Sequence, residues 1–139
     1  MPPKALILRA PGINRDKDVA FACELAGATP ERVHVNQIAA GTVRLADYAL
    51  IIIPGGFSYG DHLGAGKLLA VDLAHRLGEP LHRFVADGRP VIGICNGFQV
   101  LVKAGLLPGW DDDPAPAVTL TENESARFEC RWVRLEADP

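Results

Sequence analysis

The feature that most constrains the fold is an unbroken apolar run at residues 48–53, Tyr-Ala-Leu-Ile-Ile-Ile, which ends at a Pro-Gly-Gly turn. An apolar run without alternation is typical of a strand that is buried on both faces, as strands are in parallel sheets. Residues 4–9 and 90–94 form shorter runs of the same kind, and residues 32–36 form a fourth strand-like segment. The sequence therefore predicts a parallel sheet with both of its faces covered.

Segments with helical patterns separate these strands. Residues 16–26 predict a helix that ends at Gly27. Residues 63–87 predict a long helical stretch with a break near Gly78 and Pro80, and residues 98–104 predict an apolar helix. Strands that alternate with helices imply right-handed βαβ units. We therefore expect an α/β fold of the flavodoxin-like, doubly wound kind, with a mainly parallel sheet and helices on both faces.

The C-terminal part of the sequence reads differently. Residues 111–116 are polar and rich in proline, which predicts a surface loop. Residues 118–120 and 127–135 predict strands of a further β section. The last strand-like segment has no evident successor before residue 139, so we expect one domain over residues 1–139 that is truncated at its C-terminus.

Composition excludes several classes of protein. A net charge of −3 with 48% hydrophobic residues excludes intrinsic disorder, and 14 basic against 17 acidic residues argue against a nucleic-acid partner. No apolar run approaches the ~20 residues of a membrane span, and the N-terminus lacks the pattern of a signal peptide. The three cysteines form no C-x-x-C pair, so neither a zinc site nor a disulfide framework is expected. We expect a cytoplasmic protein with no membrane partner.

The chemistry-bearing motif is Gly93-Ile94-Cys95-Asn96-Gly97, which lies between a predicted strand and a predicted helix. It is the thiol counterpart of the nucleophile elbow, a sharp strand-to-helix turn. The positive end of the following helix dipole favours the thiolate form of Cys95. A small buried core cysteine is the alternative interpretation. The position at the carboxyl end of a central strand, where doubly wound sheets bind ligands, favours the functional one.

Acyl transfer also requires hydrogen-bond donors for the oxyanion of the tetrahedral intermediate. An elbow supplies one donor from the residue after the nucleophile, here the N–H of Asn96. The glycine loop at residues 54–57 follows the strongest strand and is a candidate for the second donor, because glycine leaves the backbone N–H unobstructed. An ordinary Pro-Gly turn is the alternative interpretation of that loop.

A thiol nucleophile usually needs a base, and the chain has four histidines that could fill this role: His34, His62, His75 and His82. Only His62 lies near the glycine loop in sequence, and even there a catalytic role is not the favoured interpretation. Cys23 and Cys130 are interpreted as structural. Residues 64–67 resemble a P-loop only in part, so no nucleotide site is expected in this chain.

Three stretches carry a resemblance to a known family: residues 54–61 (Pro-Gly-Gly-Phe-Ser-Tyr-Gly-Asp), 93–99 (Gly-Ile-Cys-Asn-Gly-Phe-Gln) and 120–128 (Leu-Thr-Glu-Asn-Glu-Ser-Ala-Arg-Phe). They resemble class I glutamine amidotransferases, and among these the glutaminase subunits of phosphoribosylformylglycinamidine synthases. The turn at residues 11–16 is similar too, although the family more often has Thr or Ser before the Asn and Cys after it. The resemblance spans essentially the whole chain.

The resemblance implies roles for individual residues. Cys95 would attack the carboxamide of glutamine, form a γ-glutamyl thioester and release ammonia. Backbone N–H groups at Gly56 or Phe57 and at Asn96 would hold the oxyanion. The glutamine pocket would be shaped by four side chains: Gln99, Asn123, Ser125 and Phe128.

The resemblance also implies partners. Ammonia would pass to a large synthetase subunit that binds ATP with Mg²⁺ and the formylglycinamide ribonucleotide, and a small third subunit would complete the complex. This chain itself would carry no cofactor. The family's catalytic histidine and its carboxylate partner lie in a downstream H-x-E pattern that is absent from residues 1–139. We therefore expect an incomplete amidotransferase domain with little glutaminase turnover of its own.

Two other interpretations remain open at this stage. A DJ-1/PfpI-like protein shares the sheet and the elbow cysteine but places an acidic residue near the thiol, for which Asp16 and Asp18 are the candidates. A non-catalytic remnant would instead dock on a partner through its aromatic residues, namely Phe57, Tyr59 and Trp110.

Overall fold

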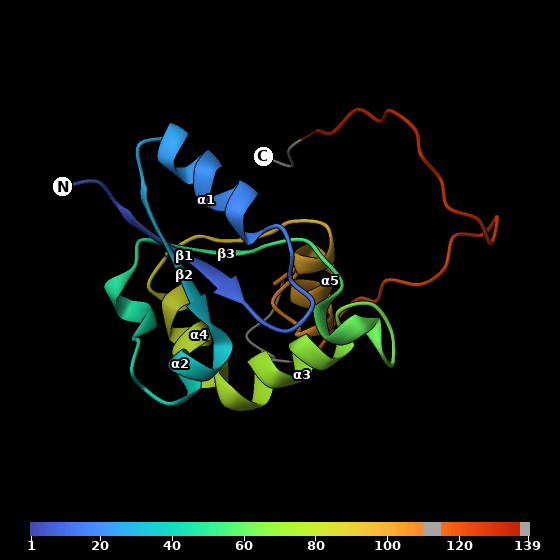
Figure 1. The fold of residues 1–139 in the computed structure, drawn as a ribbon. Coiled ribbons are helices and arrows are strands. Elements are labelled where there is room, and N and C mark those ends of the chain that lie inside the picture. The colour runs from blue at the N-terminus through green and yellow to red at the C-terminus, as the bar shows by residue number, and fades with distance from the viewer. Residues whose placement is uncertain (110–114, 137–139) are drawn as a thin grey trace.

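The computed structural model describes residues 1–109 and 115–136 and contains a sheet in which every pairing is parallel (Figure 1). Its strands lie in the order β2-β1-β3-β4, which is the order that begins a flavodoxin-like sheet. The strands are β1 (Lys4–Arg9), β2 (Thr29–His34), β3 (Leu50–Ile53) and β4 (Val91–Gly93). The predicted α/β class and the parallel sheet are both confirmed.

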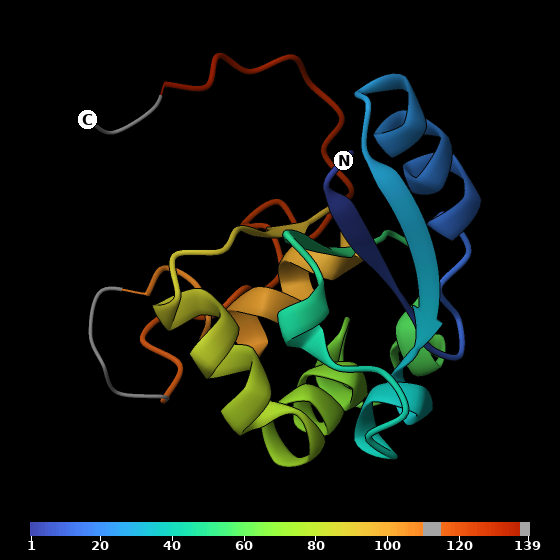
Figure 2. The same ribbon diagram turned by 90° about the vertical axis from the view of Figure 1, so that its left-hand side faces the viewer.

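Helices cover both faces of this sheet (Figures 1 and 2). The helices are α1 (Asp16–Leu25), α2 (Val35–Ala39), α3 (Lys67–Arg76), α4 (Gly78–Ala86) and α5 (Asn96–Lys103), with short 3-10 turns η1 (Leu45–Asp47) and η2 (Ser58–Asp61). Helix α1 lies on one face, and α2 to α5 lie on the other. The long helical stretch predicted at 63–87 is two helices that meet at Leu77, next to the predicted break at Gly78.

The register of the strands explains why their sequences are apolar without alternation. Ile7 of β1 pairs with Ile52 of β3, and both belong to the core cluster beneath α1. Leu6 and Ile51 face the opposite way, into the larger core cluster formed with α2 to α5. Successive residues of a strand point to opposite faces, so a sheet that is covered on both faces needs apolar residues at every position.

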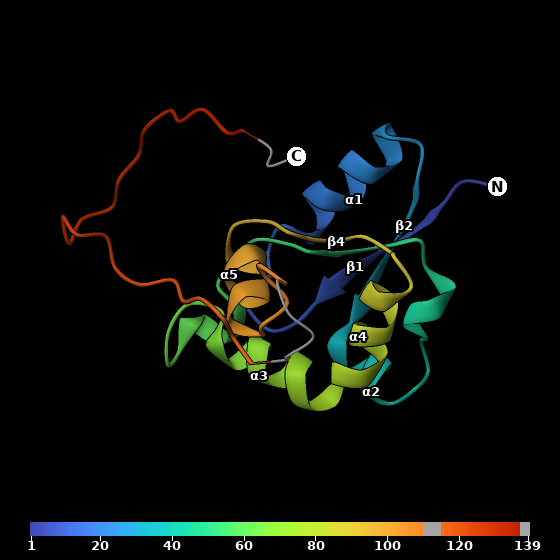
Figure 3. The same ribbon diagram turned by 180° about the vertical axis from the view of Figure 1, so that it is seen from behind.

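Strand β4 is the least covered strand. Its Ile92 pairs with Ile52 and so lies on the α1 face, but it is 44% exposed. Ile94, two residues further on, is 45% exposed. Figure 3 shows β4 leading directly into α5. The carboxyl end of β4 therefore lies at an accessible part of the molecule.

The strand predicted at residues 32–36 ends earlier in the structure than the sequence indicates. Residues 32–36 were expected to be extended, but β2 ends at His34 and α2 begins at once. Nδ1 of His34 accepts a hydrogen bond from the N–H of Asn36 (3.2 Å), and the N–H of His34 donates to Oε1 of Gln37 (2.8 Å). This reciprocal cap starts a helix where the valines alone favour a strand.

The predicted strands at 118–120 and 127–135 are wrong. Within residues 115–136 the structure has neither helix nor strand, and every residue of this segment is exposed (Figure 1). A strand is stabilised by hydrogen bonds to a neighbouring strand, and no described strand lies beside this segment. Of the loop expected at 111–116, residues 111–114 lie outside the described residues.

Within residues 1–109 and 115–136, no helix is long and apolar enough to cross a membrane. The same ranges contain no group of three or more His, Cys, Asp or Glu side chains that could hold a metal ion.

Candidate active site

Cys95 occupies the turn between β4 and α5, as the elbow motif predicts. It is the N-cap residue of α5, with φ 54° and ψ −112°. A positive φ is uncommon for any residue other than glycine, and such strain is concentrated at functional sites. The side chain is exposed, so the alternative of a buried core cysteine is excluded.

The glycines on either side of Cys95 are required by close backbone contacts. A Cβ on Gly97 would lie 1.9 Å from the carbonyl oxygen of Ile53, and a Cβ on Gly93 would lie 2.6 Å from the carbonyl oxygen of Gly97. Ile94 meanwhile donates its N–H to the same Ile53 oxygen at 3.0 Å. The G-x-C-x-G spacing is therefore what allows α5 to start directly against the end of β3.

The glycine loop after β3 lies beside the nucleophile. A Cβ on Gly55 would come within 3.4 Å of Cβ of Cys95 and 3.6 Å of the carbonyl oxygen of Ile94. Gly56 has φ +148°, and a Cβ there would meet the carbonyl oxygen of Gly12 at 2.5 Å. The glycine loop thus lies in close contact with the elbow on one side and with the turn after β1 on the other. A side chain at Gly55 would approach the side chain of Cys95.

The backbone N–H groups of this loop are not equivalent. The N–H of Phe57, one of the expected oxyanion donors, donates to the carbonyl oxygen of Gly12 at 2.9 Å in this structure. Within residues 1–109 and 115–136, the N–H groups of Gly56 and Asn96 have no hydrogen-bond acceptor. These two remain as candidate donors.

The carboxamide of Asn96 joins the two loops, which sequence reasoning did not foresee. It is 2% exposed, and its Oδ1 accepts the N–H of Ser58 at 3.0 Å. Its Nδ2 donates to Oδ1 of Asp61 at 3.0 Å and to Oε1 of Gln99 at 3.2 Å. Ser58 and Asp61 belong to the distinctive 54–61 stretch, but nothing in their spacing from Asn96 indicates a contact.

A hollow of about 480 Å³ borders α5 one turn after the cysteine. Its lining combines Gln99 with six residues of the C-terminal segment, Thr121, Glu122, Asn123, Ala126, Arg127 and Phe128. The structure thus brings together three of the four side chains expected to shape a substrate pocket. Ser125 is not among the lining residues, and its hydroxyl donates to Glu129 at 2.7 Å. Phe128 is 91% exposed.

No histidine is paired with the thiol in the described part of the chain. The ring of His62 lies against Gly60, whose Cβ would meet Nε2 at 3.1 Å. His34 caps α2 instead. Across residues 1–109 and 115–136, no hydrogen bond or ion pair joins any histidine to Cys95.

The acidic residues of the early loop are engaged elsewhere. Asp16 is 7% exposed and is held by Arg9 at 3.2 Å and Arg32 at 3.1 Å. Asp18 pairs with Arg15. Neither carboxylate has a hydrogen bond or ion pair with the thiol among the described residues, and the feature expected of a DJ-1/PfpI-like site is therefore not supported.

The aromatic residues proposed for docking on a partner differ in how exposed they are. Phe57 is 65% exposed. Tyr59 packs against the larger core cluster and donates its hydroxyl to Asp72, and burial with this hydrogen bond raises the pKa of Tyr59 to about 12. Trp110 lies outside the described residues. Of the three residues named for docking, Phe57 is the one that the described part of the chain shows as exposed.

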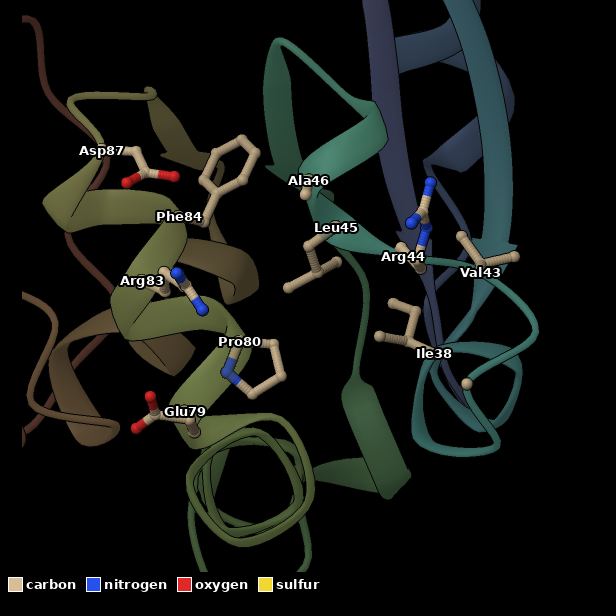
Figure 4. Close-up of a pocket in the computed structure, with 11 residues that line it drawn as sticks. Ile38, Val43, Arg44, Leu45, Ala46, Glu79, Pro80, Arg83, Phe84 and Asp87 are labelled. Atoms are coloured by element: carbon tan, nitrogen blue, oxygen red, sulfur yellow. The ribbon is translucent and has the colours of Figure 1, made fainter.

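A second hollow, of about 390 Å³, lies between α4 and the segment that joins α2 to β3 (Figure 4). Pro80 and Phe84 of α4 face Ile38 and Leu45 across it, and Arg83 lies at its rim. No residue of the elbow or of the glycine loop lines this hollow. It is separate from the candidate active site.

Comparison with known proteins decides the family. Residues 2–139 match the family of CobB/CobQ-like glutamine amidotransferase domains. The chain belongs to this family. The elbow cysteine and the glycine loop are thus seen in an amidotransferase domain, in agreement with the resemblance found in the sequence.

Individual amidotransferase relatives are similar over almost all of the chain. The phosphoribosylformylglycinamidine synthase subunit PurQ of Treponema denticola is 52% identical over 97% of this chain, and that of Dehalococcoides mccartyi is 52% identical over 98%. Among solved structures, "Structure of PurLQS from Thermotoga maritima" has a TM-score of 0.74 and 36% identity over 96% of this chain.

The similarity covers only part of each relative. The match spans 54% and 53% of the two curated relatives and 54% of the solved chain. The chain therefore spans about half the length of the amidotransferase relatives that it matches.

Proposed function

We propose that this chain is the nucleophile-bearing part of a glutaminase subunit that supplies ammonia for making formylglycinamidine ribonucleotide in purine biosynthesis. The observation that carries the proposal is the exposed thiol of Cys95 on a strained elbow, with the glycine loop packed beside it. The 52% identity to subunits of phosphoribosylformylglycinamidine synthase supports the choice of this reaction within the family.

The proposed chemistry proceeds in two steps. In the first, the Cys95 sulfur bonds to the side-chain carbonyl carbon of glutamine, and the N–H groups of Gly56 and Asn96 stabilise the oxygen as it becomes negative. The C–N bond then breaks, and the amide nitrogen leaves as ammonia with the proton lost by the thiol. In the second step, water cleaves the γ-glutamyl thioester, which yields glutamate and restores the thiol.

The remaining site residues are proposed to bind the substrate. Gln99, Asn123 and Phe128 share the hollow beside the elbow, which supports a role in holding glutamine. Ser125 is proposed with less direct support, because its hydroxyl is engaged by Glu129. We also propose that the base and its carboxylate partner come from outside residues 1–139, so that this chain alone has little turnover.

The proposed partners follow from the relatives. Ammonia that escapes into neutral water becomes ammonium, which is not a nucleophile, so direct transfer to a synthetase subunit makes chemical sense. The similar solved structure is that of PurLQS, which supports a partner subunit for this chain. We propose that the complex contains a large synthetase subunit and a small third subunit. ATP and Mg²⁺ would bind to the synthetase subunit.

Covalent labelling tests the proposal without requiring turnover. A diazo-ketone analogue of glutamine should label Cys95 selectively, with loss of N₂ and formation of a thioether that peptide mass spectrometry locates. Excess glutamine should protect Cys95, and the Cys95→Ser variant should remain unlabelled. Labelling spread equally over Cys23, Cys95 and Cys130 would contradict the proposal, and selective reaction of Cys95 with methylglyoxal in its place would favour a DJ-1/PfpI-like activity.

Turnover gives a second measurement. Glutamate release by the chain should be far below that of a complete amidotransferase, both alone and with the synthetase subunit, because the deacylation step lacks its base. Release at the rate of a complete enzyme would show that residues 1–139 contain the base.

A further inference from the structure

The side-chain carboxamide of Asn96 forms hydrogen bonds within the protein through its oxygen and through both hydrogens of its nitrogen. Its one described acceptor bond comes from the N–H of Ser58, and the two hydrogens of Nδ2 go to Asp61 and Gln99. A primary amide has two donor hydrogens, and both are engaged here. Because Ser58 offers a donor and Asp61 an acceptor, the orientation of this buried amide is fixed by its neighbours.

Asp61 links this amide to a third element. Its Oδ1 accepts from Nδ2 of Asn96 at 3.0 Å and from the N–H of Gly66, the N-cap residue of α3, at 3.2 Å. Asp61 itself has φ 53°, an uncommon conformation for a residue with a side chain. Hydrogen bonds to an ionised carboxylate are roughly twice as strong as neutral ones. The half-buried carboxylate therefore fastens the end of η2, the 3-10 turn that follows the glycine loop.

These side-chain bonds are the polar connection between the loop and the elbow. Within the described ranges, no backbone hydrogen bond joins residues 55–61 to residues 93–99. The bonds from Ser58 and Asp61 both end on the carboxamide of Asn96. The N–H of Gly56 belongs to the glycine loop, and the N–H of Asn96 belongs to the elbow. The distance between these two N–H groups therefore depends on the hydrogen bonds from Ser58 and Asp61 to Asn96.

We propose that Asp61 is a positioning residue for the glutaminase reaction: through the side chain of Asn96 it holds the glycine loop against the elbow and so sets the distance between the two oxyanion donors. The inference rests on the proposed function and deepens it. Asp61 does not contact the reacting atoms and has no role as a base in this proposal. Its effect is on the rate of the covalent step, because small misplacements of catalytic groups cost large factors in rate.

The test uses the labelling kinetics of the full chain. The diazo-ketone places a carbonyl oxygen where glutamine has its amide oxygen, so its maximal inactivation rate, kinact, reports on the donors and its half-saturating concentration, KI, reports on binding. Iodoacetamide lacks the glutamyl group and reports on the thiol alone. In Asp61→Ala we expect kinact to fall about 10- to 100-fold, with KI and the iodoacetamide rate within about twofold of wild type.

Two further variants keep the test decisive. Asp61→Asn retains an oxygen that can accept both hydrogen bonds, so it should recover most of kinact. Asp47→Ala is the matched control, because Asp47 also ends a 3-10 turn but forms an exposed pair with Arg44. It should behave as wild type. If Asp61→Ala fails to fold, as circular dichroism will show, the comparison of Asp61→Asn with wild type decides the matter, and a kinact below one tenth of wild type for that variant contradicts the proposal.

The outcomes separate this inference from the proposed function. A wild-type chain that the diazo-ketone does not label overturns both. A labelled wild-type chain with an unchanged kinact in folded Asp61→Ala overturns the positioning role alone. An equal fall in the rates of both reagents also overturns it, since that result means the elbow as a whole has been disturbed.

Discussion

Residues 48–53 and residues 127–135 are both predicted to be strands, but their structures differ. In the first segment Ile51, Ile52 and Ile53 are at most 5% exposed, and β3 pairs with a strand on each side. In the second segment Trp132 is 103% exposed and Leu135 is 89% exposed, and no described strand pairs with it. Local preference for extended structure is present in both.

This difference shows that strand formation depends on neighbouring strands and helices as much as on the sequence of the segment itself. Much of what is measured as β propensity is packing against cross-strand and same-face residues. Residues 50–53 have β1 and β4 beside them and helices above and below. Residues 115–136 pair with no described strand, and all of them are exposed. We therefore expect the two regions to respond very differently to substitution.

The largest effect is expected where the backbone is most tightly packed. Gly97→Ala would place a methyl group 1.9 Å from the carbonyl oxygen of Ile53, which forces α5 away from β3. We expect a loss of at least about 3 kcal/mol in the free energy of unfolding, measured by urea denaturation followed by circular dichroism. Gly78→Ala is the control, because nothing lies within 4 Å of its Cβ, and it should be neutral or slightly stabilising. Equal stability of the two variants would refute the close packing of the elbow.

The second prediction compares apolar side chains of the two regions directly. Leu69 of α3 is 0% exposed in the main core, so Leu69→Ala should cost about 2–5 kcal/mol in urea denaturation. Trp132→Ala removes a larger side chain that is fully exposed, and it should change stability by less than about 0.5 kcal/mol. A loss above about 2 kcal/mol in the free energy of unfolding for Trp132→Ala would mean that residues 127–135 pack against the domain in solution. The proposed difference between the packed core and the exposed segment would then be wrong.

The smallest effect concerns alkaline pH and reports on the packed region alone, because both tyrosines of the chain, Tyr48 and Tyr59, lie there. The pKa of Tyr59 is raised from 10.0 to about 12 by burial and the hydrogen bond to Asp72. A group whose folded pKa is raised stabilises the fold fully below its unfolded pKa and loses this contribution as pH rises through the folded pKa. Stability should therefore fall between about pH 10 and pH 12.

Tyr59→Phe should reduce this alkaline fall and cost about 1 kcal/mol at neutral pH, measured as Tm and urea midpoints from pH 7 to pH 12. Burial and Glu31 also raise the pKa of Tyr48, so Tyr48→Phe is the parallel variant and the double variant should flatten the profile further. An unchanged profile in both single variants would show that tyrosine ionisation does not set the alkaline limit.

The sequence was sufficient to predict the sheet and the elbow because both depend on local patterns. Continuous apolar runs indicate buried parallel strands, and a cysteine between closely spaced glycines indicates a tight strand-to-helix turn. The cap at His34 was missed because a histidine between valines favours a strand until its side chain bonds to Asn36. The strands predicted at 118–120 and 127–135 do not form, because no described strand lies beside them to accept and donate hydrogen bonds.

The candidate site was predictable only in part. Cys95, Gly56 and Asn96 follow from the motif, but the engagement of the Phe57 N–H by Gly12 depends on a turn 45 residues earlier in the chain. The contact between Asp61 and Asn96 joins residues 35 positions apart through side chains alone. No periodicity relates such residues, so the connection is visible only in the folded structure.

The position of the Ile53 carbonyl has a consequence for the order of folding. This one oxygen accepts the N–H of Ile94 and also lies against Gly97, so the elbow is shaped against the finished end of β3. During synthesis β1, β2 and β3 leave the ribosome before β4, and each pairing is with a strand that already exists. The exposed, strained turn at Cys95 can therefore take its final shape only after the carboxyl end of β3 is in place.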